Sequence, residues 1–244
     1  MPEREGGKMP AFFKDYEEFL GTGRSNEQGQ SLDEFLEEYD PYKYKNPCVT
    51  TDAAVLTYEG EPAPDAVWRV LLIQRRNHPS IGFWALPGGF IELGENLDAT
   101  ARRELEEETG VEGLALEQIR TFGDIKRDPR ARIISTAYLA VCEAGSVRAQ
   151  AGDDAKDARW FRIGYTAEEV PAADGWRAEV RHFTLTDESG EVCLKADVLV
   201  EERTGLVREK RYRTLSKGEI AGDHAEVLAA AWETVLGRLP GAKV

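Results

Sequence analysis

The sequence predicts an α+β protein in which strands predominate and one helix is especially well marked. Short runs of apolar and β-branched residues recur along the chain, separated by turn signals that contain glycine and proline. Between residues 96 and 109 the pattern changes to a helical period, and Gly110 follows as a residue suited to the left-handed position that ends a helix. Strands on both sides of one such helix favour an α+β fold over a βαβ array.

Length and composition describe a globular chain with room for a proper core. It has 244 residues, 41% of them hydrophobic, and no window approaches the roughly 18 apolar residues that cross a membrane. The first ten residues are polar and lack the apolar stretch of a secretory signal, so we expect a cytoplasmic protein without a membrane partner. Its three cysteines are far apart and should be reduced. None of its three histidines lies within a turn or two of a cysteine, so we expect no zinc site and oxygen ligands for any metal.

The strongly acidic charge narrows the classes of partner. Lysine and arginine number 31 against 45 aspartates and glutamates, a formal net charge of -14. Duplex nucleic acid needs a cationic surface, so we expect no nucleic-acid partner. A small polyanionic substrate remains compatible, because divalent cations can lie between carboxylates and phosphates.

The chain divides into five segments on the sequence pattern. Residues 1–10 form a disordered tail, 11–45 a helical arm, 46–165 the core, 166–221 a β-rich insertion and 222–244 a terminal helix that returns to the core. In the arm, helix signals cover 12–20 and 31–40, and Ser31 with Glu34 fits a capping box. Thirty residues cannot bury a core of their own, so the arm should pack on the core or on a partner subunit, which makes a homodimer possible.

Strand signals precede and follow the marked helix. In the core they cover 48–58, 67–76, 115–125, 131–143 and 157–163, and in the insertion 181–187, 191–202 and 208–216. The near-continuous apolar run of 67–73 indicates a strand covered on both faces. The terminal helix reads as amphipathic, with Asp223 as its N-cap.

The marked helix carries three glutamates on one face: Glu104, Glu107 and Glu108. Offsets of three and four residues place them within an arc of about 100°, beside an apolar stripe of Leu97, Ala101 and Leu105. Three such carboxylates repel one another, and a magnesium ion would offset that repulsion. The alternative for the charge run alone is an ordinary solvated helix face.

The full spacing around the helix is far more specific than the charge run. It reads Gly89, Glu95, Arg103-Glu104, Leu105, Glu107-Glu108, Gly110 and Val111. This pattern resembles the Nudix box, the signature of a family that hydrolyses nucleoside diphosphates linked to another group. The resemblance implies an α/β/α sandwich with a mixed sheet, and Mg²⁺ as cofactor with Mn²⁺ as a substitute.

The same resemblance implies roles for individual residues. Glu104, Glu107 and Glu108 would be metal ligands together with Gly89, and Arg103 would orient a glutamate through a salt bridge. The base that activates water would be one of these glutamates or a loop carboxylate, for which Asp154 is the candidate and Asp153 the second choice. An ordinary acidic loop is the alternative for that pair.

Stretches outside the box resemble the ADP-ribose pyrophosphatase branch of the family: WALPGGF, FGDIKRDPRARIISTAYLAV and GDDAKDARW. On this resemblance we expect Arg127 and Arg130 to clamp a phosphate or ribose and Asp128 to accept a hydroxyl. Trp84, or else Phe83, would stack on a base. The alternatives are a core position for Trp84 and an ordinary turn at Asp128.

The predicted function is magnesium-dependent hydrolysis of ADP-ribose, or a related nucleotide, to AMP and ribose 5-phosphate. Other substrates of this kind are a nucleotide sugar, NADH or an oxidised dNTP. A ligand-sensing transcription regulator is the competing class, although residues 165–244 hold 11 basic against 15 acidic residues and show strand signals where a helix-turn-helix would lie. The insertion could form a lid, mediate dimerisation or supply its REKRYR stretch to an anion.

Overall fold

The first long strand, β1, lies in the middle of a mixed sheet in the computed structural model, which describes residues 12, 15–152, 155–203 and 205–240. β1 runs parallel to β6 along its whole length and antiparallel to β2 and β4. Among these residues the sheet has the order β10-β9-β8-β7-β2-β1-β6-β5, with β3 on β2 and β4 on β1. The strands are β1 (Cys48–Tyr58), β2 (Trp68–Arg75), β3 (Trp84–Ala85), β4 (Gly88–Phe90), β5 (Glu117–Phe122), β6 (Ile133–Glu143), β7 (Ala155–Val170), β8 (Arg177–Asp187), β9 (Cys193–Arg203) and β10 (Glu209–Ser216).

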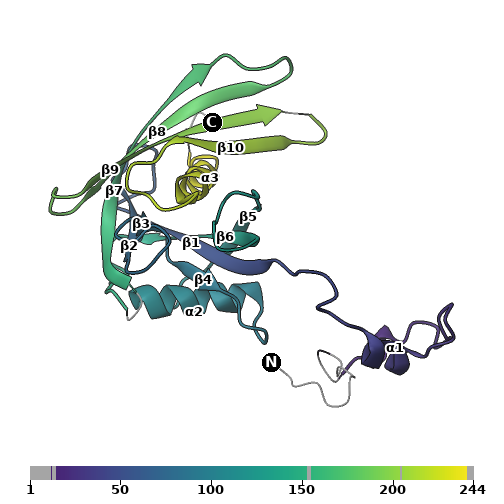
Figure 1. Ribbon diagram of the computed structural model, residues 1–244. Helices are drawn as coiled ribbons and strands as arrows, with labels where there is room; N and C mark the ends of the chain where they lie inside the picture. The colour runs from purple at the N-terminus through teal and green to yellow at the C-terminus, as the bar shows by residue number, and fades with distance from the viewer. Residues whose placement is uncertain (1–11, 13–14, 153–154, 204, 241–244) are drawn as a thin grey trace. The chain divides into compact units, whose positions relative to one another are not determined.

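Two helices cover opposite faces of this sheet, as Figure 1 shows. Alternate residues of β1 and β2 enter two separate cores, one with α3 (His224–Leu236) and the other with α2 (Leu97–Thr109). The predicted burial of both faces of 67–73 is therefore confirmed, since Val70 and Leu72 face α3 while Leu71 faces α2. This arrangement is the predicted α+β sandwich with a mixed sheet.

The marked helix forms as the sequence predicts. Ala101 and Leu105 are buried, Leu97 packs against the same core, and Gly110 adopts the left-handed conformation at φ 66°. Asn96 occupies the N-cap position without a side-chain hydrogen bond. The helix therefore holds its place through its apolar stripe, with its glutamates at the edge.

The insertion continues the sheet instead of forming a separate lid. β7 extends to Val170, past the predicted end of its strand at 163, and pairs with β8 from Phe161 to Val170. β8 in turn pairs with β9, and β9 with β10. These strands place α3 between themselves and β5–β6 (Figure 1).

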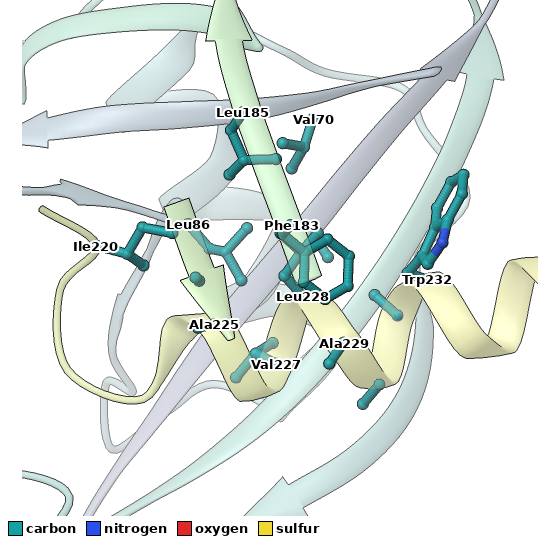
Figure 2. Close-up of a cluster of buried hydrophobic side chains, with 14 of the residues drawn as sticks. Val70, Leu86, Phe183, Leu185, Ile220, Ala225, Val227, Leu228, Ala229 and Trp232 are labelled. Atoms are coloured by element: carbon teal, nitrogen blue, oxygen red, sulfur yellow. The ribbon is translucent and has the colours of Figure 1, made fainter. Parts of the chain in front are cut away.

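The terminal helix is amphipathic as predicted, but its polar face of Glu226 and Glu233 meets β10, so no residue from His224 to Leu236 is exposed. Phe183 of β8 lies beside Leu228 of α3 (Figure 2), and Leu185 and Trp232 belong to the same core. The added strands cover its apolar faces and also bond its two glutamates, Glu226 to Thr214 and Glu233 to Tyr212 of β10.

The N-terminal segment, Met1–Asn46, forms a unit of its own, separate from Pro47–Val244. Its predicted capping box is present at α1 (Leu32–Glu38), where Ser31 and Glu34 exchange hydrogen bonds. The helix predicted over 12–20 is wrong, because only the 3-10 turn η1 (Glu17–Phe19) forms among its described residues. Across the described ranges, no helix is long and apolar enough to cross a membrane.

Candidate active site

A pocket of about 550 Å³ opens where α2, β1 and β4 meet the loop that follows β5. Its wall includes the predicted residues Gly89, Glu104, Glu108, Arg127, Asp128 and Arg130. Residues of β1, of the loop after β2 and of the N-terminal end of α3 complete it. The structure therefore brings α2, which we call the glutamate helix, and residues 127–130, which we call the RDPR loop, to one cavity although they lie far apart in sequence.

Glu108 is the most deeply placed of the three glutamates. Its carboxylate accepts a hydrogen bond from the backbone N–H of Gly88 at 2.8 Å. Burial, and to a smaller extent the nearby Glu104, raise the pKa of Glu108 to about 8, although that hydrogen bond acts to lower it. Burial likewise raises the pKa of Glu104, although its ion pair with Arg103 opposes the shift.

Arg103 braces the site by holding three carboxylates. Its guanidinium donates to Glu95 at 2.8 Å, to Glu104 at 2.8 Å and to Glu107 at 3.0 Å. The predicted orienting salt bridge of Arg103 to a glutamate is thus present. Glu107 lies at the rim, with its side chain 60% exposed, so the three glutamates share a helix face but differ in depth.

The glycine before the helix fits closely against Glu104. A Cβ atom added to Gly89 would lie 2.4 Å from the carboxylate of Glu104, so a side chain there would displace it.

At the other end of α2, Gly152 donates its N–H to the carbonyl of Glu108 at 2.9 Å. The acidic loop therefore begins at this helix end, but Asp153 and Asp154 lie outside the described residues.

The donor set fits a hard divalent cation. Glu104 and Glu108 are carboxylates whose neutral forms burial favours, and a bound cation would reverse that preference. Glu104, Glu108 and the backbone of Gly89 line the pocket and could hold it. Within the described chain no three His, Cys, Asp or Glu side chains converge as a ready-made metal cluster, so ligation by all three glutamates stays a prediction.

Arg127 lies in the pocket wall, but carboxylates already bind the guanidinium that was predicted to clamp a phosphate. It donates two hydrogen bonds to Asp223, at 2.8 and 2.9 Å, and approaches Asp52 at 3.4 Å. Only 7% of its side chain is exposed. The arginine therefore fastens the RDPR loop to the start of α3 and to β1, and its predicted clamping of substrate has these aspartates as competitors.

The carboxylate of Asp223, the N-cap residue of α3, consequently does not cap its own helix. Asp223 occupies the N-cap position but makes no side-chain hydrogen bond to the helix, because its carboxylate binds Arg127. The next residue, His224, accepts a hydrogen bond at Nδ1 from the N–H of Leu86, and its Nε2 lies 3.9 Å from Asp52. The linker before α3 pairs with Trp84 of β3, which brings both residues to the pocket.

The remaining polar residues of the pocket differ in their availability. Arg130 pairs with Asp128 at 2.8 Å and lies over the ring of Phe90. The charges of Arg130 and Asp128 therefore neutralise each other.

Arg75 has no carboxylate within ion-pair distance among the described residues, and its Nε donates to the carbonyl of Pro79. Burial, and then the nearby Arg130, lower the pKa of Arg75, although the carboxylates of Glu108, Asp128 and Asp52 act in the opposite direction.

The aromatic prediction needs correction. Trp84 is 2% exposed and its ring meets the edge of Phe161 in the core, so it presents no face to a base. This is the core position that the sequence left open as the alternative. Phe83 packs, half-buried, against a neighbouring small cluster.

Comparison with known proteins agrees with this geometry. The model of the NUDIX domain family matches residues 50–184, more than half of the chain. The chain belongs to the Nudix family. A MutT/nudix family protein from Enterococcus faecalis has the same fold with a TM-score of 0.64 and 30% identity, over 94% of this chain and 79% of that one.

Two curated Nudix relatives match the central part of the chain. An ADP-ribose pyrophosphatase of Methanocaldococcus jannaschii is 40% identical over 95 residues, 39% of this chain and 55% of that protein. The ADPR responsive transcriptional repressor NtrR of Acinetobacter baylyi is 39% identical over 109 residues, 44% of this chain and 42% of that protein. The match thus spans about half the length of these relatives.

Sequence reasoning about this Nudix protein missed several residues of the pocket. Asp52 is a carboxylate in the middle of the apolar strand β1, and that interruption was the available signal. It accepts a hydrogen bond from Ser135 as well as facing Arg127. Arg75 and His224 gave no signal, because their place in the pocket depends on how the loop after β2 and the start of α3 meet the Nudix box.

Proposed function

We propose that this Nudix protein hydrolyses the pyrophosphate of a nucleoside diphosphate linked to a second group, with ADP-ribose as substrate and AMP and ribose 5-phosphate as products. The strongest support is that one pocket holds the buried carboxyls of Glu104 and Glu108 together with Arg75. Carboxylates that can hold a cation and a guanidinium that can bind phosphate oxygens are what this reaction needs.

Each residue of the pocket has a part in this proposal. Bound Mg²⁺ or Mn²⁺ would neutralise pyrophosphate charge and lower the pKa of a water molecule. Glu104, Glu108 and the backbone of Gly89 would hold the cation, and Glu107 would join them by leaving Arg103. Arg75 would bind phosphate oxygens through the N–H groups that Pro79 leaves free.

A carboxylate must then take the proton of the attacking water. Asp154 keeps this role in the proposal, with Asp153 as the second choice. The position of Gly152 at the carbonyl of Glu108 supports it, because the acidic loop starts beside the glutamates.

The test is a substrate panel with the purified full chain and Mg²⁺. We expect ADP-ribose to be hydrolysed fastest among ADP-ribose, NADH, dinucleoside polyphosphates, nucleotide sugars and oxidised dNTPs, with AMP identified by chromatography. Chelation of the metal should abolish turnover. Absence of hydrolysis across the whole panel would contradict the proposal.

A second candidate function is an ADP-ribose-responsive regulator, which the 39% identity to the repressor from Acinetobacter baylyi favours. A regulator would bind duplex DNA with an affinity that ADP-ribose changes. Fluorescence anisotropy with genomic DNA fragments, with and without ADP-ribose, separates the two functions. Hydrolysis without DNA binding supports the enzyme, and ADP-ribose-sensitive DNA binding without turnover supports the regulator.

A further inference from the structure

The two edge strands of the sheet come together beside α3. β5 and β10 stand at opposite ends of the strand order, yet Arg120 of β5 donates a hydrogen bond to the backbone carbonyl of Lys210 in β10 at 2.6 Å. The guanidinium of Arg120 also lies 5.0 Å from the ring centre of Tyr212. The sheet thus curves around α3 until its edges meet at a seam.

A second cavity, of about 740 Å³, lies along this seam. We call it the seam pocket, and it is lined by β5, β10 and the loops that follow each of them. It adjoins the active-site pocket, because the two have five wall residues in common: Lys126, Arg127, Lys217, Gly222 and Asp223. A group in the seam pocket would therefore be a neighbour of a ligand on the glutamates.

The contacts of Arg120 exclude one kind of occupant. A peptide strand added to the free edge of β10 would need the carbonyl of Lys210, which the side chain of Arg120 already occupies. Tyr212 is also engaged, with its hydroxyl hydrogen-bonded to Glu233 of α3. The seam pocket accordingly suits a small ligand and not a strand.

The wall of the seam pocket is positively charged, although the whole chain is negatively charged. Its wall has seven lysines and arginines and four aspartates and glutamates, a net of +3 by subtraction, whereas the whole chain carries -14. Three of the acidic groups already have donors: Asp223 accepts from Arg127, Asp124 from the N–H of Lys126, and Glu226 from Thr214. The side chains of Lys126 and Arg213 have no acidic partner within ion-pair distance in the described ranges.

We propose that the seam pocket is a subsite for a phosphate-bearing group, beside the pyrophosphate that the glutamate site cleaves. The proposal rests on the proposed function for its link to catalysis, while the subsite itself rests on the cavity and on the unpaired cations Lys126 and Arg213. Its ligand is either an additional phosphate carried by the substrate or a free phosphate that acts as an effector. Both sources present the same oxygens to the same two side chains.

The experiment compares ADP-ribose with 2′-phospho-ADP-ribose, which differ by one phosphate. Calorimetry without divalent metal gives the Kd of each, and kinetics with Mg²⁺ give kcat/KM. For the intact chain we expect the phosphorylated compound to bind about tenfold more tightly, the effect of one charge-assisted hydrogen bond. Lys126→Ala and Arg213→Glu should each abolish that preference.

Arg208→Glu is the matched control, because Arg208 is exposed in the turn before β10 and lies outside both pockets. It should keep the preference. If the preference is absent but millimolar inorganic phosphate changes the Kd of ADP-ribose in the intact chain and not in Arg213→Glu, the ligand is a free phosphate and the subsite stands. Neither effect, or an equal loss in Arg208→Glu, overturns the proposal. Failure of hydrolysis with the binding preference intact would instead count against the proposed function alone.

Discussion

At the scale of single residues, the site depends on how differently three neighbouring glutamates are placed. Glu108 is part-buried beside a single backbone donor, Glu104 is part-buried and paired with Arg103, and Glu107 is exposed at the rim. Burial disfavours a charged carboxylate, and an ion pair favours it. The same helix face therefore offers a cation two carboxylates of different basicity and a third that can be recruited from solvent.

The brace around Arg103 predicts a pH-dependent contribution to stability. Hydrogen bonds from Arg103, and then from Thr100, lower the pKa of Glu95 from its ordinary 4.5 to about 2. The stabilisation by Glu95 is therefore complete above pH 4.5 and is lost as the pH falls toward 2. We expect urea unfolding to show Glu95→Gln less stable than the intact protein at pH 7, with a difference that narrows by pH 3. A difference of equal size at both pH values would contradict this account.

The contact between Gly89 and Glu104 predicts a functional cost for one added methyl group. Gly89→Ala should move the carboxylate of Glu104 and lower kcat for ADP-ribose by about tenfold or more, since small displacements of a positioned group are costly in catalysis. Gly94→Ala is the matched control, because a Cβ there meets nothing within 4 Å. Equal kinetics for the two variants would show that the close approach of Gly89 has no catalytic role.

At the scale of elements, α3 is buried because β8, β9 and β10 cover it. Leu228 is 2% exposed and packs in the core that the helix shares with β8. Leu228→Ala should lower the free energy of unfolding by about 2–5 kcal/mol, the usual cost of a large cavity in a core. Leu206→Ala, at a fully exposed position in the β9–β10 turn, should change it by less than about 0.5 kcal/mol. Denaturant titration of both variants measures the difference.

Elements with a local signal were predictable from the sequence, and those set by distant contacts were not. The helix of the Nudix box carries its stripe, its glutamates and its terminal glycine within fifteen residues, so its limits followed from the chain itself. The capping box at Ser31 was equally local. The helical period over 12–20, by contrast, yields only a short 3-10 turn among its described residues, because a weak amphipathic pattern does not fix a helix without packing.

At the scale of the whole molecule, the curvature of the sheet determines what surrounds the site. It brings β10 to β5 and the start of α3 to the RDPR loop, so that Asp223, His224 and Arg127 meet although they lie far apart in sequence. The spacing of residues along the sequence cannot reveal neighbours of this kind. This is why the glutamates were predicted, whereas the pairing of Arg127 with Asp52 and Asp223 and the place of Arg75 in the pocket were not.

The central claim is that the carboxylates of the glutamate helix support metal-dependent hydrolysis. Steady-state kinetics of ADP-ribose hydrolysis with Mg²⁺ should be compared for the intact chain, Glu108→Gln and Glu106→Gln. Glu108→Gln removes a carboxyl that burial already disfavours in its charged form, so folding should survive while kcat falls about a hundredfold or more. Glu106, exposed on the same helix, should be replaceable without loss. Activity of Glu108→Gln within a few-fold of the intact chain, or an equal fall in Glu106→Gln, would contradict the claim.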